Sequence, residues 1–96
     1  MSPKNKIKLK LIRKKLDKID YQLLKVIKKR TEVVKKVLSL KSYKKEIIDK
    51  KRISVVLKKI RKEYLKKNID QKITHRIWKN MIWSYIDFEK RNFKKK

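Results

Sequence analysis

Residues 12–24 read IRKKLDKIDYQLL, and their apolar side chains recur at steps of three and four. This spacing places apolar side chains on one face of an α-helix. It continues on both sides of the stretch and predicts one amphipathic helix from about Asn5 to Ser39. The apolar positions are Leu9, Ile12, Leu16, Ile19, Leu23, Val26, Ile27, Val33, Val34, Val37 and Leu40.

The predicted first helix is too long for the core of one small domain. At about 1.5 Å per residue it would extend roughly 50 Å, whereas a compact domain of this size has a radius of gyration of only about 13 Å. A chain of 96 residues also buries a modest core unless a second copy contributes to it. We therefore expect another chain to cover part of the apolar stripe.

Two shorter helices are predicted after a polar connector at residues 41–48. Asp49 and Asp70 are suited to cap the starts of helices over about 50–67 and 71–91, and Asn68 can end the first of these in a left-handed conformation. We read residues 94–96 as a frayed basic tail. No stretch has the alternation of a strand, so the fold class is all-α, a three-helix chain that forms a single domain over residues 1–96. The apolar faces are Ile53, Val56, Leu57, Ile60 and Tyr64, then Ile73, Ile77, Met81, Ile82, Tyr85, Ile86 and Phe88.

The formal charge of +25, from 34 Lys and Arg against 9 Asp and Glu, would suit a nucleic-acid-binding protein. The lysines, however, are spread over nearly every segment, alongside many Ile and no Gly or Ala, which favours a drift toward A/T-rich codons. The aromatic residues of the third helix could stack on bases, but their helical spacing favours core packing. Nucleic-acid binding therefore remains the alternative of another class. These aromatic residues are Trp78, Trp83, Tyr85, Phe88 and Phe93.

Several functional classes lack the residues that they require. The chain has no Cys and one histidine, His75, so we expect no metal site, no thiol nucleophile and no cofactor. There is no Gly for a phosphate-binding loop or a nucleophile elbow. No apolar run approaches the roughly 18 residues of a membrane span, and MSPKNKIKLK lacks the apolar stretch of a signal peptide. We expect a cytoplasmic protein without a membrane partner, in which His75 serves packing or the surface.

Arginine is scarce in this lysine-rich chain, so the positions that keep it are informative. Only arginine offers the planar fork that matches a carboxylate. Arg30 and Lys41 are eleven residues apart, close to three helical turns, and would point the same way on a continuing helix. Arg13 lies seventeen residues before Arg30 and projects from another face, from which it could complete the pocket of a second subunit.

The pattern IRxxLDxIDxxLL of residues 12–24, followed by Arg30 and Lys41, resembles the first helix of the AroQ class of chorismate mutases and of the related isochorismate pyruvate lyase. The resemblance extends from about Ile12 to Phe93. It implies an intertwined helical homodimer that binds a small dicarboxylate, either chorismate or isochorismate. The mutase converts chorismate to prephenate in aromatic amino-acid biosynthesis, without a covalent intermediate.

The resemblance also implies roles for individual residues. Arg13 of the partner subunit and Arg30 would each grip one substrate carboxylate, and Lys41 would lie beside the ether oxygen where negative charge develops. Lys41 and Glu89 would be the catalytic residues. The substrate-binding set implied by the resemblance is Arg13, Arg30, Lys41, Arg52, Ile53, Tyr85 and Glu89.

Two positions depart from the mutase pattern. Ile53 follows Arg52 where mutases typically carry a Glu that binds the ring hydroxyl, and this departure fits the lyase better. Glu89 stands where bacterial mutases usually carry Gln; it would repel the developing charge unless it were protonated, which predicts more activity at lower pH, or turned toward Lys41. We place the mutase first, the lyase second, and a homologue that binds such ligands without turning them over third.

Overall fold

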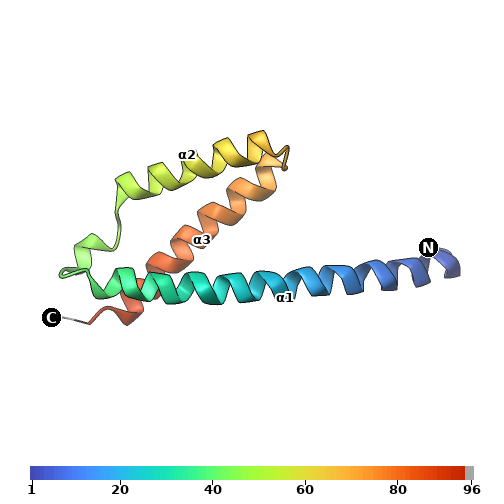
Figure 1. Ribbon diagram of the computed structural model, residues 1–96, viewed down its shortest axis with the longest axis horizontal. Helices are drawn as coiled ribbons and strands as arrows, with labels where there is room; N and C mark the ends of the chain where they lie inside the picture. The colour runs from blue at the N-terminus through green and yellow to red at the C-terminus, as the bar shows by residue number, and fades with distance from the viewer. Residues whose placement is uncertain (95–96) are drawn as a thin grey trace. The chain divides into compact units, whose positions relative to one another are not determined.

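The computed structural model describes residues 1–94 and contains three α-helices, with no strand among those residues. The helices are α1 (Pro3–Ser39), α2 (Lys50–Lys66) and α3 (Gln71–Asn92), and a short 3-10 helix, η1 (Lys44–Glu46), lies in the connector (Figure 1). The predicted all-α, three-helix fold is confirmed, and each boundary agrees to within two residues. Of the predicted basic tail only Lys94 is described, and it is not helical; Lys95 and Lys96 lie outside the described residues.

Side-chain caps fix the starts of α2 and α3 as predicted. Asp49 Oδ1 accepts the backbone N–H of Arg52 at 2.9 Å, and Asp70 Oδ1 accepts that of Ile73 at 2.9 Å. Each carboxylate thereby satisfies one of the N–H groups that the first turn of a helix leaves without a helical partner. Asn68 adopts the left-handed conformation, with φ 56°, that ends α2 and allows the turn into α3.

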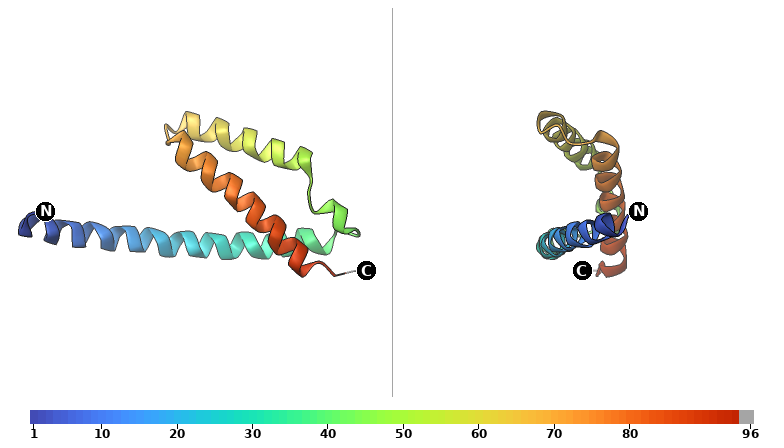
Figure 2. Two further views of the ribbon diagram at one scale, coloured as in Figure 1. Left: turned by 180° about the vertical axis from the view of Figure 1, so that it is seen from behind. Right: turned by 90° about the vertical axis from the view of Figure 1, so that its right-hand side faces the viewer.

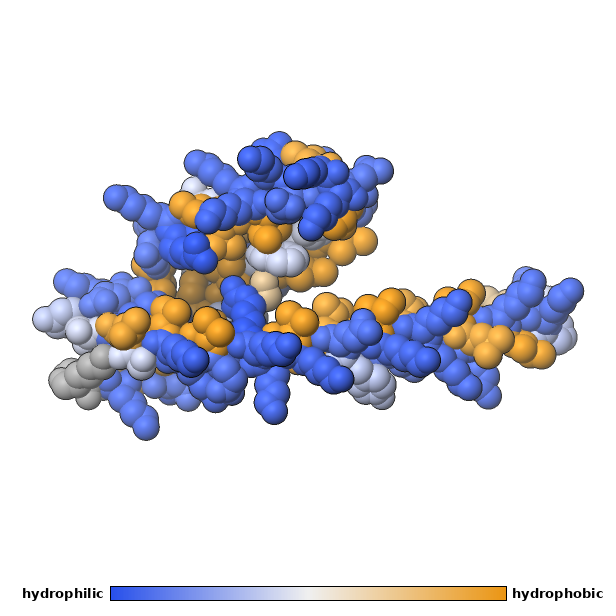
Figure 3. Space-filling view, in the orientation of Figure 1, coloured by the Kyte–Doolittle hydropathy of each residue, from blue (hydrophilic) through white to orange (hydrophobic). Residues whose placement is uncertain are grey.

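The chain consists of two compact units, Met1–Val33 and Val34–Lys96. The first unit is the greater part of α1, and its apolar stripe is uncovered in the single chain. Ile12, Leu16 and Ile19 are each about half exposed, at 51–54%. The stripe runs along the helix between basic side chains (Figure 3). Its exposure agrees with the expectation that the core of one chain is too small to cover it.

The second unit is built on a hairpin of α2 and α3, which pack against each other and meet at the turn of residues 67–70 (Figures 1 and 2). Its buried apolar cluster joins Leu38 of α1, Ile47 of the connector and Ile86 of α3. Ile47 is the most deeply buried apolar residue within residues 1–94, with 3% of its surface exposed. The connector is therefore an anchored part of the core and not only a polar link, because Ile47 and Ile48 provide it with apolar contacts. Partly buried side chains packed against the cluster are Ile48, Ile53, Ile82 and Phe93.

The predicted core role of the α3 aromatics holds only in part. Trp83 is 51% exposed, so the prediction is wrong for this residue in the single chain. The other aromatic residues are partly buried, namely Trp78, Tyr85, Phe88 and, directly after α3, Phe93. The apolar positions Ile73 and Ile77 are also exposed, at 60% and 53%. His75 lies at the surface, as predicted. No helix within residues 1–94 is both long enough and apolar enough to cross a membrane.

Removing the cap of α3 should weaken the fold by a defined amount. We expect Asp70→Ala to lower the free energy of unfolding by about 1 kcal/mol, because one N–H group of the first turn loses its acceptor. Asp70→Asn is the matched control, since asparagine caps about as well and removes only the charge. Urea unfolding at a fixed protein concentration would measure both variants, and an equal loss in the two would contradict the role of the cap.

Candidate active site

Lys41 and Glu89 form an ion pair that joins the end of α1 to the last turns of α3. Lys41 Nζ lies 2.9 Å from Glu89 Oε1, and the two side chains are 17% and 9% exposed. Lys41 lies two residues after the end of α1, and its backbone N–H donates to the carbonyl of Leu38 at 3.1 Å in the turn that closes the helix. The pair thus holds a mostly buried positive charge at a fixed place in the second unit.

Helical spacing explains why Glu89 is buried. It follows Ile86 by three residues and Ile82 by seven, so all three side chains lie on one face of α3, the face that packs on the apolar cluster. A buried carboxylate is costly unless it is paired and hydrogen-bonded, and Lys41 supplies the partner. Of the two arrangements expected for Glu89, the structure has the one in which the carboxylate is turned toward Lys41.

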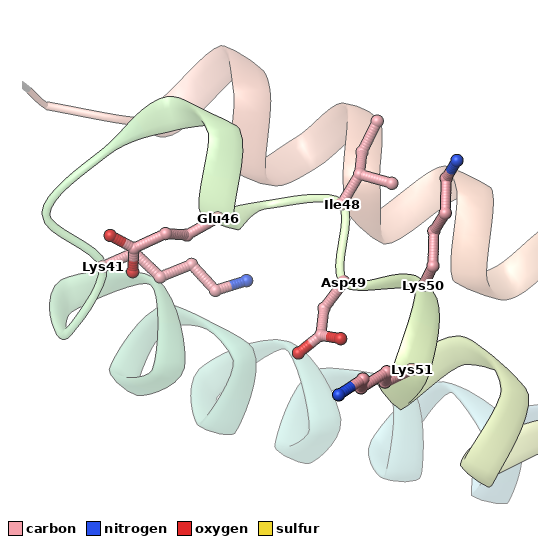
Figure 4. Close-up of a pocket in the computed structure, with 6 residues that line it drawn as sticks. All are labelled: Lys41, Glu46, Ile48, Asp49, Lys50 and Lys51. Carbon is pink, nitrogen blue, oxygen red and sulfur yellow. The ribbon is translucent and has the colours of Figure 1, made fainter.

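An open pocket of about 500 Å³ lies beside Lys41 in the connector region (Figure 4). Its two carboxylates are already engaged in local structure: Glu46 accepts the backbone N–H of Tyr43 at 3.2 Å, and Asp49 caps α2. Among the lining residues only Lys41 is predicted as a site residue from the sequence, because helical periodicity does not reveal how a connector folds back. The pocket is lined by Lys41, Glu46, Ile48, Asp49, Lys50 and Lys51.

The remaining predicted site residues of the second unit occupy different environments. Arg52 is exposed in the first turn of α2, whereas Ile53 is half-buried and packs against the apolar cluster. Tyr85 is also half-buried, and its ring meets that of Phe88 edge to face, with centroids 6.4 Å apart and an interplanar angle of 78°. Ile53 and Ile82 pack against the same cluster, which contains Ile86.

Arg13 and Arg30 belong to the first unit, where Arg13 is exposed and Arg30 is half-buried. Seventeen residues of continuous helix separate them by about 25 Å. One small dicarboxylate cannot span this distance, so the two arginines of a single chain cannot grip the same molecule. Their roles remain predictions.

The described residues hold no group of three His, Cys, Asp or Glu side chains that could bind a metal ion. The charged groups that they offer a ligand at the open pocket are the ammonium groups of Lys41 and two further lysines, together with two carboxylates. The ammonium groups can bind a small anion and stabilise negative charge on it.

Residues 12–90 match the chorismate mutase type II family, and the chain belongs to this family. The match covers most of the chain and confirms the resemblance that the pattern of residues 12–24, followed by Arg30 and Lys41, indicated. Membership supports a function of the chorismate mutase type, which is an isomerase activity on chorismate. No curated protein and no solved structure matches the chain.

Breaking the Lys41–Glu89 pair should cost more than breaking an exposed pair. We expect Lys41→Met to lower the free energy of unfolding by about 3 kcal/mol, because it leaves the Glu89 carboxylate buried without a partner. Adding Glu89→Leu should recover most of the loss, since the double variant buries no charge.

The pair of Lys67 and Glu63 provides the control, because it is 3.6 Å apart and its side chains are 65% and 52% exposed. Lys67→Met should change the free energy of unfolding by less than about 1 kcal/mol. Chemical denaturation at one protein concentration would compare the variants. Equal effects of Lys41→Met and Lys67→Met would show that the Lys41–Glu89 pair stabilises the fold no more than an exposed ion pair does.

Proposed function

We propose that this chain is a chorismate mutase that converts chorismate to prephenate as a homodimer. The observation that carries the proposal is the mostly buried Lys41 ammonium beside an open pocket, in a chain that belongs to the chorismate mutase type II family. Arg30 and the partner's Arg13 complete the proposed site as carboxylate ligands.

The reaction needs positioning and charge rather than a nucleophile or a proton. In chorismate the ether C–O bond breaks while a C–C bond forms between the side chain and the ring, so that no atom is gained or lost. The bidentate arginines would hold the two carboxylates so that the reacting carbon atoms approach in a compact chair. Lys41 would stabilise the negative charge that develops on the ether oxygen.

The contact of Lys41 with Glu89 is compatible with this role. An ammonium group has three N–H donors, and Glu89 Oε1 accepts one of them. The other two can turn toward a bound ether oxygen while Glu89 keeps the side chain in place. Glu89 would then act on the reaction by orienting Lys41, at the cost of a negative charge near the reacting oxygen.

Isochorismate pyruvate lyase is the second candidate, and Ile53 favours it. This side chain packs on the apolar cluster and offers no hydrogen bond to a ring hydroxyl at the position where mutases typically carry Glu. The lyase would break the same type of C–O bond and release salicylate and pyruvate. Its substrate carries the ring hydroxyl elsewhere, so an apolar residue at position 53 is compatible with it.

Product identification distinguishes the two reactions. Purified protein would be incubated separately with chorismate and with isochorismate, at mildly acidic and at neutral pH, and the products identified by mass. Prephenate from chorismate supports the mutase, and salicylate from isochorismate supports the lyase. No product from either substrate would contradict both.

Arg30→Ala should reduce kcat/KM by at least about a hundredfold, because it removes the carboxylate fork that orients the substrate. Arg76→Ala is the control: Arg76 is exposed on α3 and belongs to no proposed site. Steady-state kinetics would measure turnover, and circular dichroism would check that both variants keep their helix content. An Arg30→Ala variant with normal turnover would rule out the proposed site.

The homodimer is supported by two features of α1. Its apolar stripe is about half exposed in a single chain, which would leave an extended apolar surface in water. Arg13 and Arg30 are also too far apart along the helix to serve one ligand from one chain. A second copy would both cover the stripe and bring its Arg13 to the pocket of the first.

Sedimentation should therefore give a dimer, and Leu16→Glu should weaken it by placing a charge in the apolar stripe. Lys18→Glu is the control, because Lys18 is two residues away and lies on the opposite side of the helix. Sedimentation equilibrium over a range of concentrations would measure both. A monomeric parent protein, or equal dissociation by the two substitutions, would contradict this interface.

A further inference from the structure

Lys51 lines the same pocket as Lys41 but has no role in the site derived above. It is an exposed residue in the first turn of α2. In the close-up, the Lys51 side chain extends on the side of the Asp49 carboxylate, whereas Lys50 points the opposite way (Figure 4). Of the two lysines in this turn, Lys51 is thus the one placed beside the Asp49 carboxylate.

The charges around the pocket show why a further lysine matters. The Lys41 ammonium is largely offset by Glu89, which lies 2.9 Å away. Two more carboxylates, Glu46 and Asp49, line the pocket itself and would repel a doubly negative substrate. Without Lys51, the three carboxylates of Glu46, Asp49 and Glu89 would outnumber the two ammonium groups of Lys41 and Lys50.

The negative charge of Asp49 comes with the fold, because its carboxylate caps α2 through the backbone N–H of Arg52. The Asp49 carboxylate serves as the helix cap, and its negative charge repels an anionic ligand that enters the pocket. Lys51 is well placed to offset it, and within residues 1–94 it forms no ion pair of its own. Its ammonium is therefore available to a ligand.

We propose that Lys51 is a substrate-binding residue of this site, which offsets the Asp49 charge and attracts a carboxylate of the substrate at the mouth of the pocket. This inference rests on the proposed function in taking the substrate to be a dicarboxylate. Lys51 acts on capture of the ligand and therefore on KM. Lys41, and not Lys51, is the cation proposed beside the ether oxygen, so we expect kcat to change little.

A double-mutant cycle between Lys51 and Asp49 tests the proposal. Lys51→Gln should raise KM about three- to tenfold at low salt, and the effect should fade as salt screens the charges. Asp49→Asn keeps a capping side chain while removing the charge, so adding it to Lys51→Gln should restore most of the lost affinity. In all variants kcat should stay within about twofold of the parent value.

Lys62→Gln is the matched control for net charge. Lys62 is exposed on α2, eleven residues after Lys51, so it projects from nearly the same side of the helix about 16 Å farther along. This separation exceeds the Debye length of about 8 Å at physiological salt, so Lys62→Gln should leave KM unchanged. Equal effects of Lys51→Gln and Lys62→Gln, or the absence of rescue by Asp49→Asn, would overturn the proposal.

A binding measurement separates this proposal from the proposed function. If the parent protein converts neither chorismate nor isochorismate, the proposed function fails. The same variants would then be titrated by calorimetry with a bicyclic ether dicarboxylate that mimics the compact chair. Weaker binding by Lys51→Gln, restored by Asp49→Asn, would support the role of Lys51. Equal affinity in parent and Lys51→Gln, or no binding to the parent, would overturn it.

Discussion

The ion pair of Lys41 and Glu89 is the contact on which the second unit depends. It connects two segments that lie 48 residues apart in the sequence, across a distance of 2.9 Å. Both side chains are mostly buried, so each requires the other to compensate for lost hydration. The apolar cluster of Leu38, Ile47 and Ile86 draws on the same three segments, the end of α1, the connector and α3. A small core is thereby combined with one strong polar contact.

The same contact links stability to the proposed chemistry. A lysine on a flexible stem is a poor electrostatic catalyst unless its position is fixed before the substrate arrives. Glu89 fixes Lys41 through one hydrogen bond and leaves two N–H donors for a ligand. The carboxylate also lowers the net positive charge of the site. Attraction of a dianion must therefore come from other cations, which is why the residues around the pocket matter as much as Lys41 itself.

The local features of the fold could be predicted from the sequence, because they are encoded within a few residues. Helical spacing predicted the three helices, and Asp49, Asp70 and Asn68 marked the ends that the structure has. The burial of Ile47 and the lining of the pocket could not be predicted this way, because both arise where the connector folds back on the helices. For the candidate site, family resemblance anticipated Lys41 and Glu89, whereas the pocket position of Lys51 required the three-dimensional structure.

Because lysine is so abundant in this chain, the positions of the few acidic residues say more about the electrostatics of the pocket than the positions of the lysines do. Lysine occurs in nearly every segment, so one more lysine says little, but only 9 acidic residues face 34 basic ones. Within residues 1–94, at least six of these acids have identified structural contacts: two cap helices, one accepts a connector N–H, and three form ion pairs. The electrostatics of the pocket are therefore set by the few places where the fold requires a carboxylate. Asp49 lines the pocket, and Glu89 pairs with Lys41 beside it. In the proposed site, neighbouring lysines must offset these two negative charges so that an anion is attracted.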